Sequence, residues 1–404
     1  MKRLILKFGG TSVGTIEKIK NVANIVKKRF NEGNEVIVVV SAMSGVTDEL
    51  KAKSDFISKN FDSKELDVLL ASGEQVSCSL LSGALIDLGV NARSWLGWQI
   101  PIVTNDKYTS SQIMNIKTEE ITSFISKKGV AIIAGFQGVS KDMRITTLGR
   151  GGSDLSAVAL AKFFQTDRCE IYTDVEGVLT TDPNINDKAK KIEKISYEEM
   201  LEMSSLGAKV MQPSAVQASM IDNIPLHVRS TFSQKTGTKI VSENETDYKK
   251  VVTGITYSKS NAKVSIVGVV DKPGVAADIF EPIGKNNINI DMVIQNTSLD
   301  GKTANITFTI KQQDLNKTLS TIEKNKGKLN YNKVTHDDKL AKVSIIGAGM
   351  IASPGVTYKM FRSLADEKIN ILAISTSEIK ISVLIREELT QKAVKTLHKA
   401  FDLN

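Results

Sequence analysis

Runs of consecutive apolar residues alternate with helical patterns along the first part of this 404-residue chain. In the run from Val36 to Val40 no polar residue interrupts the apolar positions, so both faces of such a strand are expected to be buried. Buried strands that alternate with helices are typical of a parallel sheet covered by helices. The pattern predicts an α/β domain over residues 1–245, with strands at 3–8, 35–41, 130–135, 168–173 and 224–229.

The rest of the chain contains an internal repeat, and each copy predicts a strand, a Pro-Gly loop, a helix, two strands and a helix. The first copy ends in a fourth strand near 328–335, whereas the second stops one strand short. We expect the apolar run 251–256 to supply that strand, after a polar linker at 242–250. The Pro is expected in the first helical turn, and the Gly to permit close ligand approach. The repeated motifs are Ala262-Lys263-Val264-Ser265-Ile266 with Ala341-Lys342-Val343-Ser344-Ile345, Pro273-Gly274-Val275 with Pro354-Gly355-Val356, and Ile288-Asn289-Ile290 with Ile369-Asn370-Ile371.

The first strand ends in Lys7-Phe8-Gly9-Gly10, and a helical pattern follows it. A strand that stops in two glycines before a helix leaves free backbone N–H groups and positive helix-dipole potential, which suit a phosphate. Lys7 adds a mobile positive charge. The segment lacks the Gly-Lys-Ser/Thr of a P-loop, and an ordinary turn is the alternative interpretation.

Further polar segments carry residues that core packing does not need. Ser41 to Asp48 follows the second strand, at a carboxyl end where α/β proteins bind ligands. Ser72-Gly73-Glu74 is expected at a helix start, where Glu74 either binds a ligand or supports the first turn. Thr147 to Asp154 is a second glycine-rich loop, and its Arg150 has the forked shape that suits a carboxylate.

Two later segments resemble parts of a nucleotide pocket. Tyr172 to Val178 and Thr180 to Pro183 follow a predicted strand and are rich in turn residues. Gly207-Ala208-Lys209 places another lysine at a helix start, where a structural lysine is equally ordinary. Together, the two glycine-rich loops, two lysines, one arginine and one glutamate favour a site for a polyphosphate and a zwitterionic carboxylate substrate.

Composition excludes several other classes of function. The net charge is +8, but lysines alternate with acids along helical faces and only 5% of residues are aromatic, so a solvated surface is favoured over nucleic-acid binding. His227, His336 and His398 lie near no acid–nucleophile set, which argues against a hydrolase triad. Cys78 and Cys169 fit no metal or redox spacing, which predicts a reduced cytoplasmic compartment. No apolar run suggests a membrane span or a signal peptide.

Six segments, in this order and spacing, resemble those of monofunctional aspartate kinases: KFGGTSV, SAMSGVTD, SGE, GRGGSD, YTDVEGV and GAKVMQPSA. The repeat resembles the tandem ACT domains that regulate such enzymes, so the resemblance covers essentially the whole chain. It implies a three-layer α/β/α amino-acid kinase domain with a mainly parallel central sheet at 1–245, and a regulatory region at 246–404. The two α+β ACT domains, of βαββαβ type, would cover about 262–336 and about 341–404, the second completed by strand 251–257.

The resemblance also implies roles for individual residues. Lys7 would neutralise the transferring phosphate, and Asp154 would orient the lysines, so both are candidate catalytic residues. Glu74 would pair with the substrate's ammonium group and Arg150 with its α-carboxylate. The expected aspartate-binding residues are Ser41, Thr47, Glu74, Arg150, Gly151, Gly152 and Ser153, and the expected ATP-binding residues are Lys7, Gly9, Gly10, Thr173, Asp174, Asp182, Lys209 and Val210.

The implied reaction is ATP-dependent phosphorylation of the side-chain carboxylate of L-aspartate, the first step towards lysine, threonine and methionine. That carboxylate is already ionised at pH 7, so no general base and no histidine is required. The obstacle is repulsion from ATP, which Lys7, Mg²⁺ and helix N-termini would offset. We expect ATP phosphates and water to hold Mg²⁺, without a protein metal site. Asn184 replaces an arginine that such kinases often have after Asp-Pro, which puts a direct charged contact to ATP in doubt.

Two alternatives remain at this stage. Another amino-acid kinase would conflict with Glu74 and Arg150, which match a free α-amino acid. A non-catalytic amino-acid sensor would not need Lys7, Arg150 and Asp154. We further expect a cytoplasmic homodimer or higher oligomer formed through the ACT domains, no nucleic-acid or membrane partner, and no homoserine dehydrogenase fused after the second repeat.

Lysine is the leading candidate effector, with threonine acting in concert as the alternative. The first repeat would bind the effector, with Asp291 next to a lysine side chain, through Asp271, Pro273, Gly274, Val275, Ala276, Asn289, Ile290, Asp291 and Gln295. The second copy has Ser353 and Leu372 in place of Lys272 and Asp291, so the two sites should differ. We expect Val356, Thr357, Ser377 and Glu378 to face the first repeat, and the strand at 251–256 to link effector binding to the kinase domain.

Overall fold

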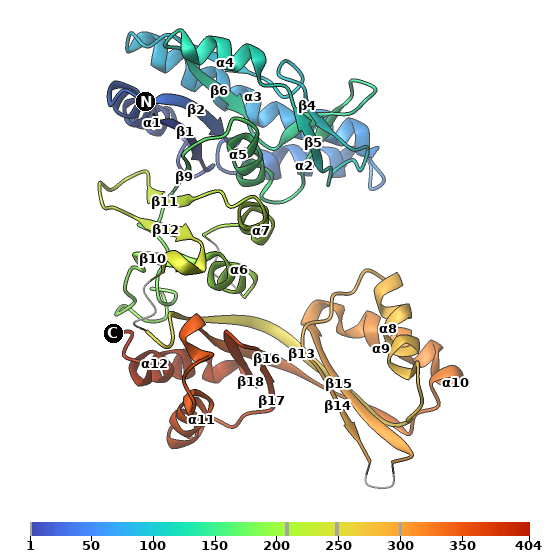
Figure 1. Ribbon diagram of the computed structural model, residues 1–404. Coiled ribbons are helices and arrows are strands. Elements are labelled where there is room, and N and C mark those ends of the chain that lie inside the picture. Colours follow the sequence, from blue (N-terminus) through green and yellow to red (C-terminus); the bar gives the residue numbers. More distant parts are fainter. Residues whose placement is uncertain (1, 207–209, 247–249, 299–300) are drawn as a thin grey trace. The chain divides into compact units, whose positions relative to one another are not determined.

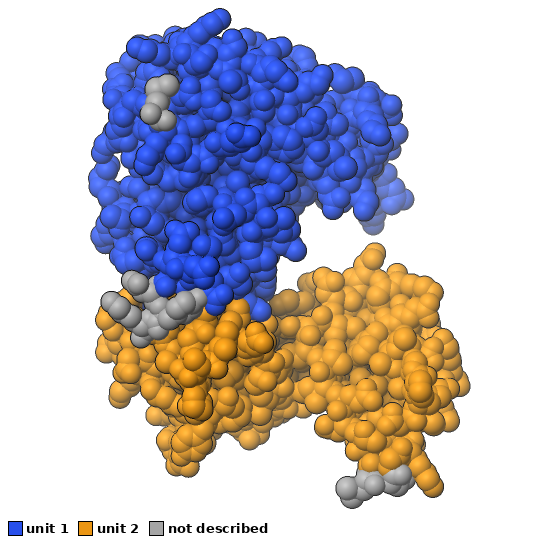
Figure 2. All heavy atoms as spheres, viewed as in Figure 1, with its two compact units in different colours: residues 1–180, 191–247 blue, residues 181–190, 248–404 orange. Residues whose placement is uncertain are grey.

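The computed structural model describes residues 2–206, 210–246, 250–298 and 301–404, and it divides into two units (Figure 2). Unit 1 consists of residues 1–180 and 191–247, and unit 2 of residues 181–190 and 248–404. The segment 181–190, which the sequence analysis assigned to the first domain, therefore packs with the second. Its contacts in unit 2, described below, are made with residues far away in the sequence, so the local sequence does not indicate them.

The central sheet of unit 1 has the strand order β10-β12-β11-β9-β1-β2-β6-β3 (Figure 1). Every neighbouring pair is parallel except β11 and β12, which confirms the mainly parallel α/β fold. The five predicted strands are present within two residues of their expected ends. The strands are β1 (Arg3–Phe8), β2 (Glu35–Val40), β3 (Ala92–Trp95), β6 (Val130–Ala134), β9 (Arg168–Thr173), β10 (Lys194–Ser196), β11 (Leu226–Ser230) and β12 (Thr238–Val241).

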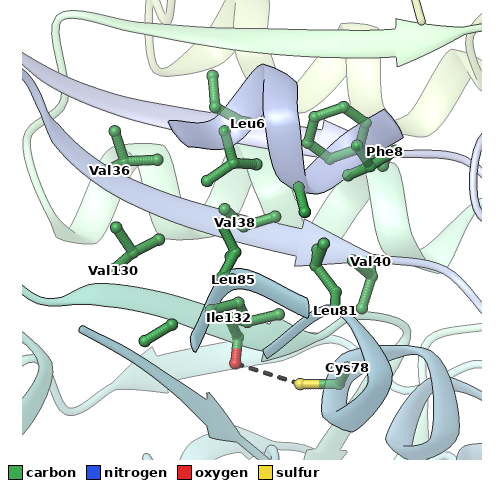
Figure 3. Packing of buried hydrophobic residues seen from close by; sticks show 14 of the residues in the cluster. Leu6, Phe8, Val36, Val38, Val40, Cys78, Leu81, Leu85, Val130 and Ile132 are labelled. Carbon is green, nitrogen blue, oxygen red and sulfur yellow. Dashed lines mark hydrogen bonds between the residues drawn. The ribbon is translucent and has the colours of Figure 1, made fainter. Parts of the chain in front are cut away.

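The core of unit 1 lies between this sheet and its helices (Figure 3). Val38 and Val40 of β2 pack with Leu81 and Leu85 of α3. Each fully buried side chain of this kind stabilises the folded state by about 1.5–3 kcal/mol. Cys78 Sγ donates a hydrogen bond to the Ile132 carbonyl at 3.2 Å. The helices are α1 (Ile16–Asn31), α2 (Val46–Ile57), α3 (Ser63–Asp87), α4 (Glu119–Ser126), α5 (Gly152–Phe163), α6 (Tyr197–Ser205) and α7 (Pro213–Ile221).

Helix α3 is long and apolar enough to cross a membrane by length and composition alone, with a mean hydropathy of 1.3 over its best window. Half of that window is buried inside unit 1, and the helix also buries the carboxylates of Asp67 and Glu74. Charged groups at these positions suit a core helix, because two carboxylates facing lipid would be costly.

A second, four-stranded sheet in unit 1, which the apolar pattern did not predict, has the order β5-β4-β7-β8. Its strands are β4 (Ile102–Thr104), β5 (Ile113–Ile116), β7 (Gln137–Val139) and β8 (Ile145–Thr147). Strands of three or four residues are too short to show an alternating pattern. This sheet matters for function because the glycine-rich loop with Arg150 begins directly after β8.

Unit 2 is built on one six-stranded sheet with the order β14-β15-β13-β16-β18-β17, so the two repeats share a sheet (Figure 1). Residues 254–258 of β13 pair with 342–346 of β16, where the sequence analysis expects the strand that completes the second repeat. The elements are β13 (Gly254–Val270), α8 (Val275–Lys285), β14 (Val293–Thr297), β15 (Thr303–Lys311), α9 (Leu315–Lys324), α10 (Lys326–Leu329), β16 (Lys333–Ile346), α11 (Val356–Asp366), β17 (Ala373–Thr376), β18 (Lys380–Arg386) and α12 (Thr390–Ala400).

Each repeat has its own core on this shared sheet. Ile279 and Ile283 of α8 pack with the first repeat, and Met360 and Leu364 of α11 with the second. The expected position of the Pro was wrong: α8 begins at Val275, after Gly274 at its N-cap, so Pro273 precedes the helix. The left-handed backbone of Gly274 (φ 94°) turns the chain into the helix, which a proline ring cannot do.

Candidate active site

A cavity of about 550 Å³ opens in unit 1 at the carboxyl ends of β1 and β2, and α3 and the start of α5 complete it. Such an edge of a parallel sheet is where α/β proteins bind ligands. The cavity brings together residues from four separate motifs of the sequence. Among the residues that line it are the predicted Lys7, Gly10, Ser41, Thr47, Glu74, Arg150, Gly151, Gly152, Ser153 and Asp154.

Lys7 and Asp154 form an ion pair on one side of this cavity, with 2.5 Å between Nζ and Oδ1. Lys7 lies near the end of β1, and Asp154 lies in the first turn of α5. Both residues are less than 10% exposed. The pair therefore keeps a cation at a fixed point, where it can meet a negatively charged ligand with little reorganisation.

Glu74 lies in the middle of α3, not at a helix start, so that expectation was wrong. Gly73 has another reason to be there: a Cβ at this position would lie 2.8 Å from the Ala42 Cβ, so glycine lets α3 approach the loop after β2. The Ala42 amide donates to Glu74 Oε1 at 3.0 Å. The other oxygen, Oε2, is buried without a hydrogen-bond partner in the described residues.

Burial raises the pKa of Glu74 from 4.5 to about 7, although the Ala42 amide and the Lys7 charge oppose the shift. Glu74 is 3% exposed and only one of its oxygens is hydrogen-bonded, so its ionised form destabilises the folded protein unless a cation binds beside it. The arrangement therefore suits a ligand that brings an ammonium group.

Arg150 belongs to the loop that connects β8 to α5, and its side chain is exposed at the cavity. Gly151 caps α5 in the left-handed region (φ 76°), which favours glycine and explains the Gly in the motif. No ion pair or hydrogen bond occupies the Arg150 guanidinium within the described parts of the chain. Its fork is available for a carboxylate.

Comparison with known proteins assigns this chain to a family. Residues 2–230 match the model of the amino acid kinase family, and residues 264–325 and 343–401 match that of the ACT domain. An aspartokinase of Pseudomonas aeruginosa is 45% identical over 405 residues, which cover 100% of this chain and 98% of that protein. The chain belongs to the aspartate kinase family. It is an enzyme that phosphorylates aspartate, and the tandem ACT domains identify its regulatory region.

Solved structures of Escherichia coli aspartokinase III share the architecture of this kinase. The complex with aspartate and ADP (R-state) matches with a TM-score of 0.81 and 25% identity, over 99% of this chain and 100% of that one. The complex with lysine and aspartate (T-state) matches with a TM-score of 0.79 and 25% identity, over the same shares.

The first glycine loop of the kinase differs from its expected form. Gly9 donates its backbone N–H to the Tyr172 carbonyl at 3.2 Å, so it is tied to β9, and Gly10 alone of the two lines the cavity. Helix α1 starts at Ile16, where the Thr15 side chain caps it by accepting from Lys18 N. The glycines therefore do not open α1 directly, because threonine is a better N-cap.

Of the residues predicted to bind the nucleotide, Lys7 and Gly10 line the cavity, whereas Thr173, Asp174, Asp182 and Val210 do not. Thr173 ends β9 and its hydroxyl donates to Asp174 Oδ1 at 3.2 Å. Asp182 packs within unit 2, where its carboxylate accepts from the Tyr257 hydroxyl at 2.7 Å and from Asn184 N at 2.9 Å. Lys209 falls outside the described residues, and Val210 is partly buried. Their roles towards ATP stay predictions.

Several cavity residues of the kinase were not predicted from the sequence. They are Lys51, Thr109, Phe136, Leu66 and Leu70. Phe136, Leu66 and Leu70 resemble ordinary core residues in a sequence. Thr109 precedes a strand too short to recognise, so no sequence signal marked it. Among the described residues, no group of three or more His, Cys, Asp or Glu side chains gathers as a metal site.

The predicted effector residues lie in unit 2 with contacts that the sequence did not indicate. Asp291 is half exposed and forms an ion pair with Lys342 of β16, so its carboxylate is already engaged. Val356 is buried in the core of the second repeat and does not face the first. Thr357, Ser377 and Glu378 are exposed in this chain. The remaining candidates are Asp271, Pro273, Gly274, Val275, Ala276, Asn289, Ile290 and Gln295, most of them at least partly exposed.

Proposed function

We propose that the cavity binds L-aspartate and that the kinase transfers the γ-phosphoryl group of ATP to its side-chain carboxylate, giving 4-phospho-L-aspartate. The buried, half-unpaired carboxylate of Glu74 carries this proposal, because it requires a cationic partner. The α-ammonium group of aspartate supplies that cation, and the Arg150 fork receives the α-carboxylate. Ser41, Thr47, Gly151, Gly152 and Ser153 surround the substrate.

The reaction needs electrostatic help and no base, because the attacking carboxylate is already ionised. Lys7 lies where the phosphoryl group would meet that carboxylate, and Asp154 holds Lys7 in place. MgATP is the second substrate, with its Mg²⁺ carried by the phosphates. Gly9, Gly10, Thr173, Asp174, Asp182, Lys209 and Val210 are the residues that we propose for the nucleotide.

We also propose that lysine inhibits the kinase through the first ACT repeat. Inhibition by lysine and threonine acting in concert is the alternative. The T-state structure of the E. coli relative is a complex with lysine and aspartate, whereas the R-state structure contains aspartate and ADP. An incoming ammonium group would compete with Lys342 for Asp291. Burial lowers the pKa of Lys342, and the Asp291 pair opposes that shift, so breaking the pair changes the charge balance of β16. The effector would therefore disturb a strand that both repeats share.

The exposed sheet edges of unit 2 support assembly into a homodimer or a higher oligomer. Strands β14 and β17 form the two edges, and they expose Val293 (52%) and Ile374 (41%). Exposed apolar edges invite pairing with another copy. We place the enzyme in the cytoplasm, at the first step towards lysine, threonine and methionine, because its substrates are ATP and a free amino acid and both cysteines are free.

A hydroxamate assay tests the proposed reaction, because hydroxylamine traps an acyl phosphate. Purified enzyme is incubated with MgATP and L-aspartate, L-glutamate or N-acetyl-L-glutamate. We expect ATP-dependent hydroxamate with L-aspartate above all, and none when ATP is omitted. Preference for either of the other acids would identify a different amino-acid kinase, and amino-acid binding without any product would identify a sensor.

A further inference from the structure

Asp67 is a fully buried carboxylate that the proposed chemistry does not use. It lies on α3, seven residues before Glu74, which places the two residues on one face of the helix with their Cα atoms about 10 Å apart along its axis. Its hydrogen-bond donors are neutral. Thr109 N donates to both oxygens at 3.0 Å, Thr147 N donates to Oδ2 at 2.8 Å, and Thr147 Oγ1 donates to Oδ1 at 2.6 Å. Burial of a charge is costly, so a carboxylate kept here has a specific task.

The donors to Asp67 belong to the two loops that border the cavity beside Arg150. Thr109 lies between β4 and β5, and Thr147 is the last residue of β8, three residues before Arg150. Both threonines line the cavity. The loops are also joined directly, because Ser111 N donates to the Thr147 carbonyl at 2.9 Å. Asp67 therefore fastens the start of the Arg150 loop to the same helix that carries Glu74.

We propose that Asp67 is a positioning residue that holds the Arg150 loop at a fixed distance from Glu74 and Lys7 and thereby selects substrates by length. This inference rests on the proposed roles of Glu74 and Arg150. Those two groups fix the α-amino acid head of the substrate, and Lys7 fixes the point of phosphoryl transfer. A rigid separation between head and transfer point suits aspartate and rejects glutamate, which is one methylene longer.

The test uses Asp67→Asn and Thr147→Val, which removes only the hydroxyl contact to Asp67. Glu65→Gln is the matched control. Glu65 lies on the same helix as Asp67 and pairs with Arg144, which directly precedes β8, but this pair lies on the exposed surface. For each variant, kcat and KM are measured for aspartate, glutamate and ATP, with a thermal melt. We expect Asp67→Asn to raise the KM for aspartate roughly tenfold, to leave that for ATP within about twofold, and to reduce the preference for aspartate over glutamate several-fold.

Thr147→Val should change the same quantities in the same direction by less, and the double variant should fall short of the sum because both act on one contact. A lower melting temperature with an unchanged KM for aspartate and unchanged preference would show that Asp67 is merely structural. If Asp67→Asn does not fold, Thr147→Val decides by the same criteria. If Arg150→Lys raises the KM for aspartate and Asp67→Asn does not, this inference alone is overturned. If Arg150→Lys leaves the KM for aspartate unchanged, the proposed role of Arg150 itself is overturned.

Discussion

The two units both bury charged side chains, but they treat those charges differently. In unit 1 Glu74 is 3% exposed, and one of its oxygens has no hydrogen-bond partner among the described residues. In unit 2 Lys342 is 6% exposed and is paired with Asp291. A buried charge without a partner destabilises the folded chain, so it is retained where a ligand supplies the partner. A buried charge with a partner does not need a ligand, and a ligand must compete for it.

Under the proposed roles, this difference separates a site that is ready for its substrate from a contact that an effector has to break. The cavity of unit 1 has the polar groups in place before aspartate arrives, as electrostatic preorganisation requires. Under the proposal for lysine, the pair in unit 2 would have two states, closed on itself or open on a ligand, as a regulatory element requires. Substitutions in unit 1 should therefore affect turnover or substrate affinity, and those in unit 2 mainly inhibition.

The largest effect is expected for Lys7→Ala, which removes the cation from the point where phosphoryl charge develops. We expect kcat to fall by on the order of 10²-fold or more, measured with saturating ATP and aspartate. The substitution also leaves Asp154 buried without Lys7, so Lys7→Ala with Asp154→Asn is the control for stability. The double variant should recover melting temperature but not turnover. Near-normal turnover in either variant would contradict the assignment of Lys7.

Glu74→Gln should weaken aspartate binding by roughly 30-fold or more, because the substrate ammonium loses a buried charged partner. The pH dependence gives a sharper test. In wild-type enzyme without substrate the pKa of Glu74 is about 7, so kcat/KM for aspartate should fall as the pH drops below that value. This acid limb should be absent from Glu74→Gln, and a limb that persists unchanged would assign the titration to another group.

Stability should respond to the same residue in the opposite sense. The pKa of Glu74 is higher in the folded protein than in the unfolded chain, so the folded state holds its proton longer and loses stability as the pH rises from about 4.5 to about 7, with no further loss well above that value. Without substrate, Glu74→Gln should therefore melt at a higher temperature than the wild type at pH 8 and show a smaller difference at pH 5. Aspartate should stabilise the wild type and not the variant.

Arg150→Lys should give a smaller loss, because the charge remains and only the fork is removed. We expect the KM for aspartate to rise roughly tenfold with little change in that for ATP. Arg144→Lys is the control, because Arg144 directly precedes β8, the strand that Arg150 follows, and is paired with Glu65 at the surface. A rise in the KM for ATP alone would move Arg150 to the nucleotide site.

The sequence was sufficient to predict the long apolar strands and the internal repeat. The apolar runs predicted the five central strands, and the repeat predicted two α+β copies. The interior position of Glu74 in α3 was missed, since Gly73 resembles a helix boundary and its reason is a contact with Ala42. The short strands β4, β7 and β8 were missed, because three residues carry no period.

Pairings between distant residues could not be predicted either, since nothing in the sequence relates their positions. Asp291 and Lys342 are 51 residues apart, and Asp182 and Tyr257 are 75 apart. Lys342 occupies the place in the repeat where Lys263 stands in the first copy, and the repeat pattern does not mark either lysine as a partner of Asp291. Such contacts decide which candidate residues are free to bind a ligand.

The smallest expected effect concerns the pair in unit 2, and it has two opposite arms. Asp291→Ala removes the proposed acceptor for lysine, so inhibition by lysine should require a roughly 2- to 5-fold higher concentration, with uninhibited activity nearly unchanged. Lys342→Met removes the competitor and leaves Asp291 free, so inhibition should occur at a correspondingly lower concentration. Lys311→Gln is the control for a general change of charge, because the Lys311 charge also acts on Lys342 but its ammonium group donates to Ser258 and not to Asp291 in the described parts of the chain. If both arms shift inhibition in the same direction, the pair affects regulation through stability of the sheet and not through competition. If neither shifts it, with lysine alone or with threonine, the effector binds elsewhere.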